Sequence, residues 1–145
     1  MNLSPHFSLQ ELTASDTAAK LNINNSPPVP VLMNLSILAS GLEQIRSLLG
    51  YPIHVNSGYR CPELNKSVRG VPDSAHLSGF AADIVCPQFG TPEQIVLAIQ
   101  KAGIPVDQAI QEGTWVHVSF APTMRNQFLT AHFNSEGKAN YTTGV

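Results

Sequence analysis

The chain has 145 residues, of which 43% are hydrophobic and 12% are charged, and its formal net charge is −2 at pH 7. This length and composition suit one folded domain with a sizeable core, and they exclude a disordered chain. The slight negative charge, with Lys and Arg scattered along the chain, argues against nucleic acid or an anionic membrane surface as a partner.

The first eight residues have neither the basic start nor the apolar stretch of a signal peptide. No apolar run approaches membrane-spanning length, so we expect no membrane insertion. We expect synthesis in the cytoplasm, and action on an external target would need another route of export. Cys61 and Cys86 form no C-x-x-C pair, and we interpret them as reduced thiols, with a single disulfide as the alternative.

The first third of the chain is predicted to be helical around one loop. Residues 8–11, Ser-Leu-Gln-Glu, form a capping-box pattern, which predicts a short helix to Thr13. Residues 22–30 are rich in Asn and Pro, as is typical of a loop. Over residues 31–49 apolar side chains recur every three or four positions, and Gly50 follows, which predicts a helix that ends there.

Short strands and helices are predicted to alternate in the middle of the chain. The strands cover residues 53–56 and 80–85, where apolar residues alternate or form a short run. The helices cover residues 61–68 and 91–102, each with Pro in its first turn. Residues 69–75 are predicted to form a loop.

The last third is predicted to contain two strands, 106–111 and 115–120, joined by a turn at Gly113. A last helix is predicted over residues 123–130. We expect the polar tail, residues 134–145, to be loosely ordered.

These elements show no internal repeat, no long linker and no βαβ repetition. We therefore predict a single domain over residues 1–145, which acts as a monomer. The expected fold class is α+β, with a small antiparallel sheet and flanking helices.

Two histidines and one aspartate carry the main functional signal. His76 lies in a loop of small residues, Asp83 follows seven positions later at a strand end, and His117 lies on a strand between two valines. Two imidazoles and one carboxylate, with room for water, are the ligand set of a catalytic zinc, whereas structural zinc sites usually close the fourth position with Cys. Taken singly, each residue has a plainer interpretation as a surface or hydrogen-bonded side chain. If the three converge, they indicate a metallohydrolase.

A zinc hydrolase also needs a group that accepts a proton from water and delivers it to the leaving amine. Glu112 lies five residues before His117 and is the first candidate. Its alternative interpretation is a solvated loop carboxylate, and Asp107 is the reserve candidate for the base.

Three further residues could contact a substrate. Arg60 follows a Ser-Gly-Tyr turn, where its guanidinium could bind a carboxylate or a carbonyl. Ser74 could hydrogen-bond the same substrate, but no G-x-S-x-G elbow surrounds it, so we do not interpret it as a nucleophile. Tyr59 lines the cleft or simply packs.

The pattern S-x-H-x-x-G-x-A-x-D from Ser74 to Asp83, followed by Trp115 and His117, resembles a known family. That family comprises the zinc D-Ala-D-Ala carboxypeptidases and L-alanyl-D-glutamate endopeptidases, which cut peptidoglycan stem peptides. Residues 57–60 resemble its Ser-x-x-Arg element, and residues 7–12 are similar to its phage and prophage members.

The resemblance implies an α+β fold shared with the signalling domain of hedgehog proteins. It also implies zinc on His76, Asp83 and His117, with the arginine and the serine named above at the substrate. Many relatives carry the catalytic carboxylate three residues before the last ligand histidine, a position that Thr114 occupies here. Glu112 must therefore reach the site across the glycine turn.

The leading hypothesis is a zinc metallopeptidase that cuts the stem peptide as a carboxypeptidase or as an endopeptidase. Resemblance to phage members implies action on the cell wall after holin-type release or as part of a virion, or a cryptic prophage origin. The alternative is a non-catalytic, zinc-stabilised cell-wall-binding or virion structural module. A structural ion needs neither Arg60 nor Ser74 nor Glu112, which favours the enzyme.

Overall fold

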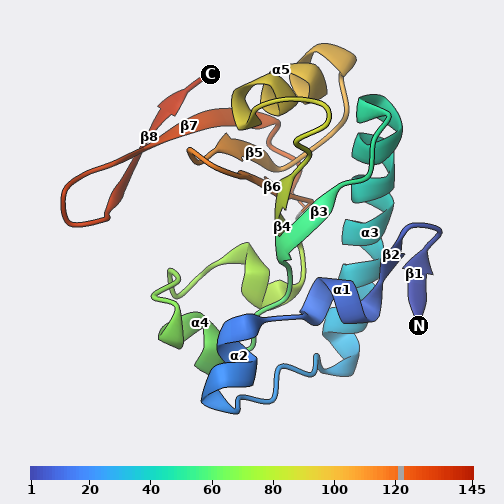
Figure 1. Cartoon of the computed structure of the whole chain (residues 1–145), viewed down its shortest axis with the longest axis vertical. Coiled ribbons are helices and arrows are strands. Elements are labelled where there is room, and N and C mark those ends of the chain that lie inside the picture. The colour runs from blue at the N-terminus through green and yellow to red at the C-terminus, as the bar shows by residue number, and fades with distance from the viewer. Residues whose placement is uncertain (121–122) are drawn as a thin grey trace.

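A six-stranded sheet and one long helix organise the chain (Figure 1), in a computed structural model that describes residues 1–120 and 123–145. In order across the sheet, the strands are β3 (His54–Ser57), β4 (Ala81–Val85), β6 (Val116–Ser119), β5 (Gln108–Gln111), β7 (Gln127–Phe133) and β8 (Ala139–Thr143). Neighbouring strands are antiparallel except for β5 and β7, which are parallel. The α+β class with an antiparallel sheet is confirmed, with that one parallel pair as an addition.

One face of the sheet belongs to the hydrophobic core, together with helices α3 (Val29–Leu49) and α5 (Pro92–Ala102). Alternate residues of the central strands point into this core and are fully buried: Ala82, Ile84, Ala109, Val116 and Val118. Because side chains alternate along a strand, the residues between them must face the other way. The open face of the sheet is therefore available for a site.

Helix α3 confirms the helix predicted from its apolar repeat and begins two residues earlier. It ends at Gly50, which has a φ of 76°, a left-handed conformation that glycine adopts without strain. Gly41 lies against the ring of Phe120, where an added Cβ would be only 2.5 Å from the ring. This close contact fixes the helix against the end of β6.

The N-terminal segment adds a two-stranded sheet and two short helices. Strands β1 (Asn2–Ser4) and β2 (Phe7–Ser8) form a hairpin, followed by α1 (Leu9–Thr13) and α2 (Asp16–Leu21). The predicted helix α1 is confirmed, and the Ser8 hydroxyl accepts a hydrogen bond from the backbone N–H of Glu11 at 3.1 Å. The hairpin and α2 were not predicted, since both are too short to show a periodic pattern.

The segment between β3 and β4 contains α4 (Pro62–Ser67) and a single 3₁₀ turn, η1 (Ala75–Ser78). The predicted helix and loop in this segment are confirmed, with η1 beginning at the last residue of the predicted loop. The strands and helices predicted between residues 53 and 120 are likewise confirmed, with ends that differ by one or two residues. No helix among the described residues has the length and apolar character needed to cross a membrane.

The prediction for residues 123–130 is wrong, because this segment leads into strand β7 rather than a helix. Asn126 has a φ of 54°, and this left-handed conformation interrupts any helix. Its backbone N–H donates to Val106 O at 2.9 Å and its side chain accepts from Val106 N at 3.1 Å. These bonds align the following residues with β5, so pairing between distant segments decides the structure.

The tail, residues 134–145, also differs from the loose order we expected. It contains strand β8, which pairs with β7 over five residue pairs from Leu129–Thr143 to Phe133–Ala139. All five residues of β8 are exposed, so their polar composition gave no burial pattern from which a strand could be predicted.

Candidate active site

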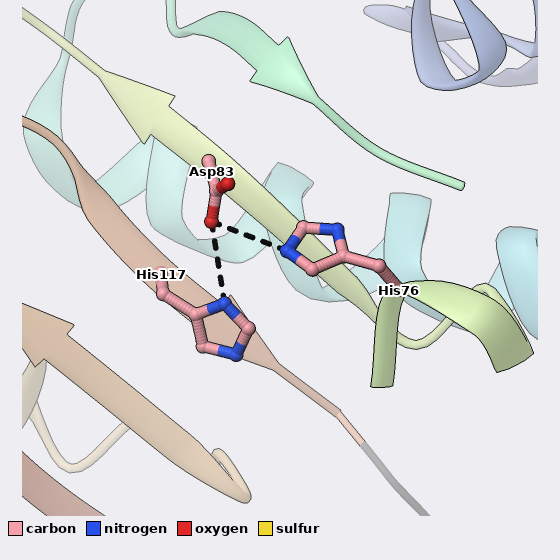
Figure 2. A group of neighbouring side chains, drawn as sticks. All are labelled: His76, Asp83 and His117. Atoms are coloured by element: carbon pink, nitrogen blue, oxygen red, sulfur yellow. Dashed lines mark hydrogen bonds and ion pairs between the residues drawn. The ribbon is translucent and has the colours of Figure 1, made fainter. Parts of the chain in front are cut away.

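Strand pairing brings two of the three expected ligands together on the open face of the sheet. Asp83 on β4 pairs directly with His117 on β6, so their side chains point to the same side. His76 comes from η1, which lies beside this face (Figure 2). The three residues expected from the sequence pattern therefore converge.

The distances within this group are short. Asp83 Oδ1 lies 3.3 Å from His76 Nε2 and 3.2 Å from His117 Nδ1, as the dashed lines in Figure 2 show. The two imidazole rings meet edge to face, with centroids 5.1 Å apart. One possible ligand atom from each residue lies within 4.8 Å of the others, so the group could hold a metal ion.

The turn η1 positions His76 through its two ends. At its start, the Ser74 hydroxyl accepts a hydrogen bond from His76 N at 3.2 Å. At its end, Gly79 adopts a φ of 77° and approaches α3 so closely that a Cβ would lie 2.8 Å from Val31 Cγ1. Any other residue at position 79 would be strained and would push η1 away from the helix.

The orientation of the His76 ring is set by a backbone carbonyl. His76 Nδ1 lies 2.7 Å from Gly58 O, and because a carbonyl only accepts, Nδ1 must carry the proton. Gly58 in turn lies against α1, where an added Cβ would be 2.3 Å from Leu12 O. The next residue, Tyr59, donates its backbone N–H to the same Leu12 oxygen at 2.8 Å. Helix α1 thus supports the residue that orients the histidine.

The position of this proton shows that the group of His76, Asp83 and His117 suits a cation. With the proton on Nδ1, a neutral His76 has a lone pair on Nε2, which faces the acceptor atom Asp83 Oδ1 at 3.3 Å. Two acceptors so close are unfavourable unless a proton or a cation lies between them. His76 is only 2% exposed, and burial lowers the pKa of its imidazole despite the opposing effect of Asp83, so a second proton on the ring is disfavoured. A metal cation fits this donor set.

Asp83 is ionised at neutral pH, as a metal ligand must be. Burial alone would raise the pKa of its carboxyl group, but its close contacts with the imidazoles of His117 and His76 outweigh this and hold the pKa well below its ordinary value. The site therefore presents one negative charge and two imidazole nitrogens.

Glu112 lies on the same open face as the ligand group. It stands two residues beyond Ile110, which pairs with His117, and its backbone N–H donates to Trp115 O at 3.0 Å. The indole N–H of Trp115 donates to Glu112 Oε2 at 2.7 Å and fixes the carboxylate. Burial, together with the nearby charge of Asp83, raises the pKa of Glu112 against the opposing effects of its other neighbours. The solvated-loop alternative does not describe this environment.

Arg60 brings a positive charge to the site. Its Nη2 donates to Ser74 Oγ at 3.3 Å, so two of the residues expected at the substrate contact one another. Burial lowers the pKa of its guanidinium, and the charges of Asp83 and Glu112 oppose this shift. Its Nε is buried and has no hydrogen-bond partner among the described residues.

Two residues considered for the site have other positions. Tyr59 is 4% exposed and lies in the hydrophobic core, which matches the packing alternative rather than contact with a substrate. Asp107, the reserve base, is buried and accepts hydrogen bonds from Arg125 Nε at 2.7 Å and Nη2 at 2.8 Å. This bidentate pair joins β5 to the segment before β7, so Asp107 has a structural role.

The remaining histidines have no place in the ligand group. His6 Nδ1 lies 2.8 Å from a carboxylate oxygen of Glu43, and His132 Nε2 lies 2.9 Å from Thr142 Oγ1. His54 is exposed on β3. Gly58 was not found from the sequence because a backbone acceptor has no side-chain signal.

A family model described as Peptidase M15 matches residues 5–119. The matched range begins ahead of β2, contains every residue of the site described above, and ends before β7 and β8. No curated protein sequence gives a significant match.

Proposed function

Because this chain belongs to the peptidase M15 family, we propose that it is a zinc-dependent peptidase that hydrolyses the stem peptides of peptidoglycan. Membership of the family makes the chain a metallopeptidase, and the zinc and the substrate are the proposal. The observation that supports it best is the facing pair of acceptors, His76 Nε2 and Asp83 Oδ1, with Glu112 and Arg60 beside them.

His76, Asp83 and His117 would hold the ion. A set of two imidazoles and one carboxylate is typical of catalytic zinc and leaves a coordination position free. When bound, zinc supplies Lewis acidity, which brings the pKa of water towards neutrality and polarises the scissile carbonyl.

Glu112 is the proposed general base. Its carboxylate accepts the proton of the attacking water and then delivers it to the leaving amine. The raised pKa supports this second step, because a carboxyl group that holds its proton longer can pass it on near neutral pH. The Trp115 indole holds the carboxylate at the site while it does so.

Arg60 is proposed to bind the substrate. Its half-buried, positively charged guanidinium can donate hydrogen bonds to the scissile carbonyl or to a substrate carboxylate, while Ser74 keeps the guanidinium in place. Either target is compatible with this geometry, so a terminal D-Ala and an internal L-Ala–D-Glu bond are both possible points of cleavage.

On this proposal the protein acts on the cell wall as a monomer, after holin-type release or as part of a virion. Nucleic acid is not a partner, in keeping with the net charge of −2. Detection of the protein in purified virions or in the free lysate would separate the two routes.

Mass spectrometry of defined muropeptides after incubation with the zinc-loaded protein tests the proposal. Cleavage between L-Ala and D-Glu would establish an endopeptidase, and loss of one D-Ala a carboxypeptidase. Chelator-treated protein is the control and should leave every muropeptide intact. If the zinc-loaded protein also leaves all of them intact, the non-catalytic wall-binding module becomes the better explanation.

A further inference from the structure

The open face of the sheet continues from the metal-ligand group onto the hairpin of β7 and β8, which forms the edge of the sheet (Figure 1). Direct register pairs connect the strands in one row: Asp83 with His117, His117 with Ile110, Ile110 with Leu129, and Leu129 with Thr143. Side chains of directly paired residues point to the same face. The hairpin therefore presents one of its faces on the side of the site.

The neighbouring row places Tyr141 in line with Glu112. Two residues beyond Ile110 and Leu129 are Glu112 and Ala131, and Ala131 pairs with Tyr141. Since side chains alternate along strands, these three residues share the open face. Ala131 has only a methyl group, so the longer side chains on either side can approach one another above it. Burial and the charge of Glu112 both raise the pKa of the Tyr141 phenol, in keeping with this proximity.

A second aromatic residue extends the same face. Phe133 lies two residues beyond Ala131 and pairs with Ala139, which makes it a diagonal neighbour of Tyr141. Tyr141 is 49% exposed and Phe133 is 50% exposed. Two half-exposed aromatic side chains beside a half-buried carboxylate form a surface that can bind a peptide through its apolar and polar parts.

We propose that Tyr141 and Phe133 bind the leaving half of the substrate, the residues that follow the scissile bond, and thereby favour internal cleavage. This inference rests on the proposed function. Glu112 must reach the leaving amine to protonate it, so the leaving half begins beside Glu112. Arg60 follows β3, which lies at the opposite edge of the sheet from β8. A leaving half that extends from Glu112 away from Arg60 therefore passes over Ala131 to Tyr141.

The distance from Glu112 to Tyr141 determines how many residues must follow the scissile bond for a substrate to reach Tyr141. Two strand spacings separate β5 from β8, about 10 Å at roughly 4.8 Å each, which an extended peptide spans with about three residues. A single D-Ala leaving group is too short to reach Tyr141. A stem peptide cut between L-Ala and D-Glu leaves a segment of the required length.

The test compares two muropeptides that differ only in the number of residues after the L-Ala–D-Glu bond, one or three. Binding is measured by calorimetry to zinc-loaded Glu112→Gln protein, with mass spectrometry confirming that the peptides stay intact. Tyr141→Ala and Phe133→Ala are introduced into this background, and Tyr141→Phe separates the phenol from the ring. Tyr51→Ala is the matched control, because Tyr51 is 42% exposed on the loop before β3.

Tyr141→Ala is expected to weaken binding of the longer peptide about tenfold, near 1.4 kcal/mol, and of the shorter one less than twofold. Tyr51→Ala should bind both peptides like the parent. Equal binding by Tyr141→Ala and the parent, or no binding by the parent, would overturn the inference. In the Glu112-containing protein the same substitution should raise KM for the longer peptide with little change in kcat. Selective binding without cleavage would support peptide binding by Tyr141 and Phe133, but it would reject the proposed peptidase and with it their effect on cleavage.

Discussion

Substitution of Gly58 by Ala should weaken metal binding without touching a metal ligand. The new Cβ would lie 2.3 Å from Leu12 O, a contact that the backbone must relieve by a shift of roughly 1 Å. The Gly58 carbonyl accepts the His76 Nδ1 proton at 2.7 Å, and a shift of that size takes it out of hydrogen-bond range. The ring then loses both its fixed tautomer and its orientation.

Loss of such an orienting partner typically costs about 10- to 100-fold in metal affinity, or roughly 1.4 to 2.7 kcal/mol. Competition between the protein and a chromophoric zinc chelator measures this change directly. Gly41→Ala is the control, because its Cβ would meet the Phe120 ring at 2.5 Å in the core, away from the site. It should lower the free energy of unfolding by about 1 to 3 kcal/mol and leave zinc affinity unchanged.

Parent-like zinc affinity in Gly58→Ala would refute the role of this carbonyl. A similar loss of zinc affinity in Gly41→Ala would show that general destabilisation, rather than the orientation of His76, explains the effect.

Three further outcomes are expected. Glu112→Gln should retain zinc in the chelator assay but lose about 10²- to 10⁴-fold in kcat on muropeptides, and full activity would move the base elsewhere. His76→Gln should lose zinc and, with it, the rise in melting temperature that zinc gives the parent, whereas the exposed control His54→Gln should keep both. Hydrogen bonds from Arg125 lower the pKa of Asp107, so their stabilisation should be present at pH 7 and disappear as the pH falls below about 3.9 towards the lowered pKa. Thermal melts of Asp107→Asn and the parent should therefore converge in acid, and a difference that persists there would contradict the ion pair.

The three candidate metal ligands could be predicted because they belong to a pattern of local spacing, from Ser74 to Asp83, and a strand with alternating residues around His117. Their convergence has a simple physical cause, since antiparallel pairing of β4 and β6 places Asp83 directly opposite His117. The role suggested for Tyr59 shows the limit of such reasoning. An aromatic residue beside a functional arginine could pack or bind, and only the observed burial decides between them.

The C-terminal hairpin could not be predicted, because its structure depends on contacts between distant residues. Asn126 and Val106 exchange hydrogen bonds across 20 positions, and Arg125 reaches Asp107 across 18. Strand β8 is exposed throughout, so its sequence has no buried face to reveal it. Tyr141 consequently gave no signal, although the register of the sheet aligns it with the proposed base.

The sheet supplies a consistent direction for the substrate. Arg60 follows β3 at one edge, two of the three candidate ligands lie on β4 and β6, Glu112 follows β5, and Tyr141 lies on β8 at the other edge. The order of strands therefore matches the order of tasks proposed for them: binding the carbonyl, holding the metal, moving the proton and holding the leaving segment. The first three tasks lie within the residues that the family model matches, and the last lies outside them. If the hairpin selects the bond, transplanting the motif residues alone would transfer hydrolysis but not this chain's preference for an internal bond.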